Sequence, residues 1–144
     1  MSNSDSLSLK QANALIASAL AKARAFNYRP MAVVVVDDSG NMKAMQREDG
    51  ASMFRVDVAR GKAWACVAMG ASSRVLTERA AANPNFFNAL AITGEGKFIP
   101  QTGGVLIMNE AGRIIGAVGA SGGTGDEDEI ICLHGLDSVG LKAA

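Results

Sequence analysis

The sequence predicts an α+β domain, in which an antiparallel sheet of about five strands is packed against helices. Two segments with the same pattern support this prediction, VVVVDDSGNM at 33–42 and VLIMNEAGRI at 105–114. Each has four apolar residues, a polar turn that contains glycine and a return segment, which is typical of a β-hairpin. Because the pattern contains no strand–helix–strand crossover, we expect the two hairpins to lie in one antiparallel sheet.

The length and composition indicate one ordinary globular domain over residues 1–144. A chain of 144 residues buries roughly 68% of its unfolded surface, which is enough for one core. Its 14 basic residues balance 14 acidic ones, whereas a nucleic-acid-binding surface would be basic. No apolar run approaches the ~20 residues of a membrane-spanning helix, so neither nucleic acid nor membrane is expected as a partner.

The sequence predicts a cytoplasmic location. The N-terminal segment MSNSDSLSLKQ lacks the charged start and apolar core of a secretory signal. Both cysteines, Cys66 and Cys132, fall in predicted helices without metal-type spacing, and we expect them to be buried, reduced thiols.

The first elements are a helix and a hairpin. Ser8 and Gln11 have the spacing of a capping box, and apolar residues at helical spacing predict a helix from Leu9 to about Phe26. The run with four valines at 31–36 predicts a buried strand, and 41–47 is its return strand.

The middle of the chain is predicted to be mainly helical. Ser52 is expected to cap a helix over 53–69, whose inner face carries small residues. A further helix begins at Ser72 or Ser73 and ends at Asn83. Residues 85–97 have no clear period and predict a loop with one helical turn at about 86–90, followed by a short edge strand at Phe98 and Ile99.

The last part contains the second hairpin and a helix. Strands at 105–108 and 113–120 lead into the turn Ser121-Gly122-Gly123. Thr124 and Glu127 again match a capping box, so a final helix is expected from about 126 to 141. Its first turn carries four acids at 126–129, a charge that suits the helix dipole.

Several common site types are disfavoured by the motifs. Gly116, Gly119 and Gly122 lack the spacing and the strand–helix–strand context of a dinucleotide site, and Gly96-Lys97 lacks the Ser or Thr of a phosphate-binding loop. His134 is the single histidine, which excludes a histidine-rich zinc site and is expected near a helix surface. We interpret the acids at 126–129 as a charged helix start rather than metal ligands.

A pocket is predicted where glycine turns meet charged residues. Glycines expose backbone N–H groups that can bind a carboxylate or oxyanion. We expect Gly103-Gly104, the strand glycines and the turn at 121–123 to approach Asp49-Gly50 and Lys62. Lys62 or Arg47 would then be the cationic partner of the anion. The alternative is that these glycines serve only tight turns and helix packing.

Motifs spread over nearly the whole chain resemble the GlcG/HbpS family, whose domain also occurs at the C-terminus of PduO-type proteins. They are REDGA at 47–51, ARGKA at 59–63, PQTGG at 100–104 and GAVGASGG at 116–123, with Asp128-Glu129. The resemblance implies a profilin-like antiparallel sheet with helices packed on both faces, and a homo-oligomer that is dimer-based and extends up to an octamer.

The resemblance leaves three functions open. The first is an oligomer that binds a small ligand, with haem or another tetrapyrrole as the candidate cofactor. The second is a lyase, isomerase or hydrolase for a small carboxylate or carbonyl metabolite of catabolism, with Lys62, Arg47 and Asp49 as catalytic residues. The third is an accessory subunit. The predicted ligand-binding residues are Gly50, Thr93, Thr102, Gly103, Gly104, Gly119, Ser121, Gly122 and Gly123.

Overall fold

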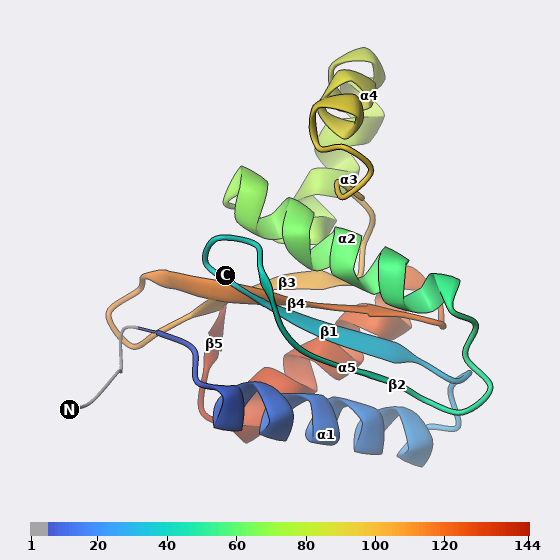
Figure 1. Ribbon diagram of the computed structural model, residues 1–144, viewed down its shortest axis with the longest axis vertical. Helices are drawn as coiled ribbons and strands as arrows, with labels where there is room; N and C mark the ends of the chain where they lie inside the picture. The colour runs from blue at the N-terminus through green and yellow to red at the C-terminus, as the bar shows by residue number, and fades with distance from the viewer. Residues whose placement is uncertain (1–5) are drawn as a thin grey trace.

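A five-stranded antiparallel sheet organises the chain in the computed structural model, which describes residues 6–144 (Figure 1). The strand order is β2-β1-β4-β3-β5, so the two hairpins lie side by side in one sheet, as predicted. Residues 1–5 of the predicted domain lie outside the described range. The elements are α1 (Leu9–Ala25), β1 (Ala32–Asp37), β2 (Met42–Arg47), α2 (Phe54–Met69), α3 (Ser73–Ala82), α4 (Pro84–Thr93), β3 (Gly104–Met108), β4 (Ile114–Ser121), α5 (Gly125–Ser138) and β5 (Lys142–Ala143).

Helices cover both faces of the sheet, which confirms the predicted fold class. Figure 1 shows α2 across one face and α1 with α5 across the other. The sheet presents alternate residues to the two sides because side chains alternate along a strand. Val33 and Val35 therefore pack with α1 and α5, whereas Val34 and Val36 pack with α2.

The two capping boxes form as predicted and set where α1 and α5 begin. The Ser8 hydroxyl accepts a hydrogen bond from the Gln11 backbone N–H, and Thr124 does the same for Glu127. Ser52 does not cap α2, which begins at Phe54 after Met53 without a side-chain cap. That part of the prediction is wrong.

The segment predicted as a loop at 85–97 is instead mostly helix α4. Pro84 occupies its first turn, where the missing N–H and fixed φ favour helix initiation. Among the ten residues of α4 only Phe87 is buried, so no apolar period marks the helix in the sequence.

The edge strand predicted at Phe98 and Ile99 does not form. The Ile99 backbone N–H donates to the Gly61 carbonyl of α2, and its side chain occupies the space that a Cβ on Gly61 would fill. Phe98 is buried beside Phe87. These residues therefore tie the α3–α4 unit to α2 rather than extending the sheet. The fifth strand is instead β5, which pairs with β3.

Both cysteines are free and buried, as predicted, and His134 is exposed on α5. Burial raises the pKa of the Cys66 thiol to about 11 and also raises that of Cys132. Within residues 6–144 no helix is long and apolar enough to cross a membrane.

The strand glycines allow α2 to approach the sheet closely. A Cβ on Gly119 would lie 2.1 Å from the Ala59 carbonyl oxygen and 3.0 Å from the Ala63 nitrogen, both in the backbone of α2. The small residues Ala59, Ala63 and Cys66 form the matching face of the helix. This face is covered by the sheet and is not a free surface for a second copy.

We predict that Gly119→Ala lowers the free energy of unfolding by about 3 kcal/mol or more, because a backbone rather than a side chain would have to move. Gly70→Ala is the control: nothing lies within 4 Å of its Cβ, and its left-handed φ of 66° accounts for a cost of about 1–2 kcal/mol. Denaturant unfolding measures both. A Gly119→Ala protein as stable as the wild type would contradict the close packing.

Candidate functional site

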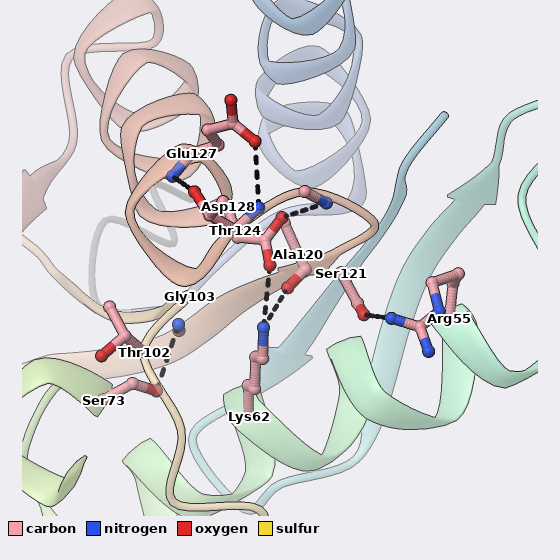
Figure 2. A network of polar contacts seen from close by, with 12 residues as sticks. Arg55, Lys62, Ser73, Thr102, Gly103, Ala120, Ser121, Thr124, Glu127 and Asp128 are labelled. Atoms are coloured by element: carbon pink, nitrogen blue, oxygen red, sulfur yellow. Dashed lines mark hydrogen bonds and ion pairs between the residues drawn. The ribbon is translucent and has the colours of Figure 1, made fainter. Parts of the chain in front are cut away.

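A buried ion pair lies where α2, β4 and the start of α5 meet. The Lys62 ammonium on α2 lies 2.9 Å from an Asp128 carboxylate oxygen, and the two side chains are 6% and 2% exposed. Figure 2 shows Lys62 extending from α2 toward Ala120 and Asp128. Lys62 also donates to the Ala120 carbonyl at 3.0 Å.

The start of α5 determines where Asp128 lies. The capping box of Thr124 and Glu127 fixes the first turn, in which Asp128 is the residue that points inward. Its second carboxylate oxygen accepts a hydrogen bond from the Gly123 backbone N–H at 3.0 Å. Asp128 therefore joins the glycine turn to Lys62 (Figure 2).

Gly103 provides the space that the ion pair occupies. A Cβ at this position would lie 2.7 Å from Lys62 Nζ and 2.9 Å from Asp128 Cβ. Its φ of 128° is also a conformation that L side chains rarely adopt. The neighbouring Gly104 N–H donates to the buried Ser73 hydroxyl, which holds the loop against α3.

The ion pair forms part of the wall of an open cavity of about 440 Å³, called here the Lys62 cavity. This volume falls in the range of about 300–1,000 Å³ that small-molecule sites occupy. Its lining residues are Arg55, Val58, Lys62, Gln101, Thr102, Ser121, Gly123, Thr124, Gly125, Asp126 and Asp128.

Arg55 is the second cation of the cavity and lies two helical turns before Lys62 on α2. One guanidinium nitrogen donates to the Ser121 hydroxyl at 3.0 Å (Figure 2). Asp126, which also lines the cavity, forms an ion pair with Arg74, and Arg74 also binds Glu129. Two cations of the described chain line the cavity, Arg55 and Lys62. Lys62 is paired with Asp128, whereas Arg55 has no acidic partner within 4 Å among the described residues.

Burial dominates the electrostatics of Asp128. It raises the pKa of this carboxyl from 3.8, while the Lys62 ammonium and the Gly123 N–H oppose the rise. The folded state therefore favours the protonated carboxyl more than the unfolded chain does.

The structure brings several predicted site residues together. Lys62, Thr102, Ser121 and Gly123 line the cavity, with Gly103 and Gly104 directly behind it. Thr102 also hydrogen-bonds Thr77 through its hydroxyl, at 3.1 Å.

Other predicted residues lie elsewhere. Arg47 and Asp49 line a separate cleft with Arg24 and Glu48. Gly50 and Gly122 line a third cleft, which shares Arg55 with the Lys62 cavity. Gly119 packs against α2, and the exposed Thr93 donates its hydroxyl to Ala89 within α4.

Sequence reasoning missed Arg55 and Asp128. Arg55 and Lys62 are seven residues apart, a spacing that puts both on one side of a helix. This spacing is visible in the sequence and could have identified Arg55 as a second cation beside Lys62. Asp128 was interpreted as part of a charged helix start, although its side chain points inward. Among the described residues, no group of three or more His, Cys, Asp or Glu side chains could hold a metal ion.

Comparison with known proteins shows that the fold is shared. The family model for haem-degrading, HbpS-like proteins matches residues 7–137. An uncharacterised 15.0 kDa protein from the dhaT–dhaS intergenic region of Citrobacter freundii is 30% identical over 91% of this chain and 90% of its own length. The corrinoid adenosyltransferase PduO of the same organism is 26% identical over 95% of this chain, but only 40% of its own length is covered.

Solved structures of similar proteins have the same fold. The crystal structure of a PduOC–haem complex superposes with a TM-score of 0.84 and 25% identity, covering 95% of this chain and 97% of that one. The structure of HbpS gives a TM-score of 0.80 and 26% identity, covering 96% and 93% of the two chains.

We predict that Lys62→Met destabilises the protein by about 3–5 kcal/mol, because it leaves Asp128 buried without its counter-ion. The double variant Lys62→Met/Asp128→Asn should recover most of this loss, since the amide oxygen can still accept from Gly123. Denaturant unfolding measures both variants.

The stability lost in Lys62→Met should depend on pH. Folding raises the pKa of Asp128 above its ordinary value of 3.8. The stability that this group contributes is therefore fully present below pH 3.8 and is lost as the pH rises through the pKa of the folded state. The Lys62→Met penalty should therefore be smaller in acid than at pH 7. A penalty independent of pH would contradict a charged Asp128 as its cause.

Proposed function

The chain belongs to the HbpS-like family, and from this membership we propose that it binds haem or a related small ligand in the Lys62 cavity. The observation that carries the proposal is the likeness to the PduOC–haem complex over almost the full length of both chains. The family match to haem-degrading proteins supports the same ligand class.

The cavity fits the carboxylates of haem at Arg55. Haem carries two propionates, and the planar guanidinium matches a carboxylate with paired N–H donors. Arg55 uses one nitrogen for Ser121 and lies on the wall of the cavity. Val58 contributes apolar surface one turn further along α2, and Phe54, 61% exposed, lies one turn before Val58.

The fit to the haem iron is weaker, because the residues of the described cavity wall supply oxygen ligands. His134 and the two cysteines are not among them. Two of the residues predicted from the sequence, Thr102 and Ser121, line the cavity and carry a hydroxyl. Ser121 is 1% exposed and accepts a hydrogen bond from Arg55, which leaves Thr102 as the candidate iron ligand. Haem bound here would supply iron chemistry, and an oxygen ligand implies modest affinity.

Hemin added to the full chain should produce a shifted Soret band. Arg55→Ala should weaken binding about tenfold or more, because a charge-assisted contact to a propionate is lost. Arg113→Ala, an exposed arginine at the β3–β4 turn, should bind like the wild type.

The two threonines separate the iron ligand from the carboxylate contact. Thr102→Ala should change the Soret spectrum, whereas Thr93→Ala should not, because its hydroxyl is held within α4 outside the cavity. No spectral shift in the wild type would remove the haem proposal altogether.

We also propose that the protein is a homo-oligomer that buries α4 against another copy. Helix α4 carries no charged residue, and Phe86 and Ile92 are 52% and 80% exposed. Figure 1 shows α3 and α4 projecting from the rest of the molecule. Exposed apolar side chains on a projecting, uncharged helix are typical of a surface that another protein covers.

Sedimentation should therefore give a species larger than the 14.8 kDa chain at micromolar concentration. Phe86→Glu/Ile92→Lys should shift it to smaller species without unfolding, because both side chains point to solvent in the single chain. A wild-type monomer would contradict the proposal.

A further inference from the structure

The Lys62–Asp128 ion pair is not explained by stability. Removing two charges from water is costly, and apolar replacements for such a pair are often neutral or stabilising. The chain nevertheless forms the pair and leaves room for it with glycine at 103. Both partners also line the cavity. These features indicate a binding role for the pair.

Lys62 has hydrogen-bonding capacity left for a ligand. An ammonium group has three N–H donors. Two are accounted for by the Ala120 carbonyl and the Asp128 carboxylate. The third can donate to an oxygen placed in the cavity. Because Asp128 neutralises the lysine and would repel a second anion, an uncharged oxygen such as a ketone or hydroxyl suits this position.

The cavity wall favours one negative charge, at Arg55. The guanidinium donates one hydrogen bond within the described chain, to the Ser121 hydroxyl, and its carbon lies 5.9 Å from the centre of the Phe54 ring. Its remaining N–H groups are therefore available to a carboxylate. The N–H groups of Gly123 and Thr124 are already bound by Asp128 and Glu127, so these two donors do not compete with Arg55 for this charge.

We infer that the Lys62 cavity binds a small monocarboxylate that carries a keto or hydroxyl oxygen, with the carboxylate on Arg55 and the uncharged oxygen on Lys62. This ligand class is the one that the enzyme alternative requires. The inference rests on the ion pair and does not depend on haem binding.

Three probes of similar size separate the two contacts. Pyruvate has both groups, propanoate lacks the keto oxygen, and hydroxyacetone lacks the carboxylate. Backbone NMR titration of the full chain should show shifts at 121–128 with pyruvate. Its affinity should exceed that for either other probe by about tenfold or more, since each of them loses one charge-assisted hydrogen bond.

Variants assign each contact. Arg55→Ala should weaken pyruvate binding about tenfold or more, while Arg113→Ala should leave it unchanged. Lys62→Met/Asp128→Asn, in which neither buried charge remains, should bind pyruvate and propanoate equally. This double variant keeps the test meaningful if Lys62→Met alone fails to fold.

The outcomes separate this inference from the haem proposal. Equal affinity of the wild type for pyruvate and propanoate, or wild-type affinity in Arg55→Ala, would overturn it. So would the absence of pyruvate binding, even in a protein that binds hemin. A protein that binds pyruvate with the expected preference supports the inference whether or not hemin shifts its Soret band.

Discussion

The contact between Lys62 and Asp128 connects parts of the molecule that otherwise lie on opposite faces of the sheet. Lys62 comes from α2, and Asp128 comes from α5. Their charges meet at the end of β4, where the backbone of Ala120 and Gly123 supplies the remaining hydrogen-bond partners. An unpaired charge at this depth would be costly, so the positions of both helices and of the glycine turn are constrained together.

Close packing of α2 makes this contact possible. Gly119 lets the helix backbone rest on β4, and Gly103 leaves space beside the ammonium group. A larger residue at either position would push α2 or the loop before β3 outward. These two glycines therefore matter because they have no side chain, which leaves space for α2 and for the ion pair. The polar groups that face the cavity come mostly from side chains.

The sequence predicted the fold in most of its parts because the signals were local. Hairpin turns with glycine, two capping boxes and the valine run of β1 all lie within a few residues of the structure that they specify. Helix α4 was missed because it buries so few residues that its sequence shows no helical period of apolar residues. The strand predicted at Phe98 and Ile99 was wrong because these residues pack against α2 instead of pairing with the sheet.

The site was predicted only in part, because its contacts are not local. Lys62 was predicted to be the cation of the pocket, but its acidic partner Asp128 lies 66 residues away. Arg47 and Asp49 are close to glycine in sequence, yet they line a different cleft. Which acid of the run 126–129 points inward depends on how α5 is seated, and charge pattern alone does not reveal that.

The ion pair is tested most directly by nitrogen-15 NMR of the Lys62 side-chain amine at neutral pH. We expect a charged ammonium signal that exchanges slowly with water, because it is buried and held by Asp128 and Ala120. In Asp128→Asn this protection should fall. A Lys62 signal that exchanges as fast as that of the exposed Lys43, or one that is unchanged in Asp128→Asn, would contradict the ion pair as the organising contact.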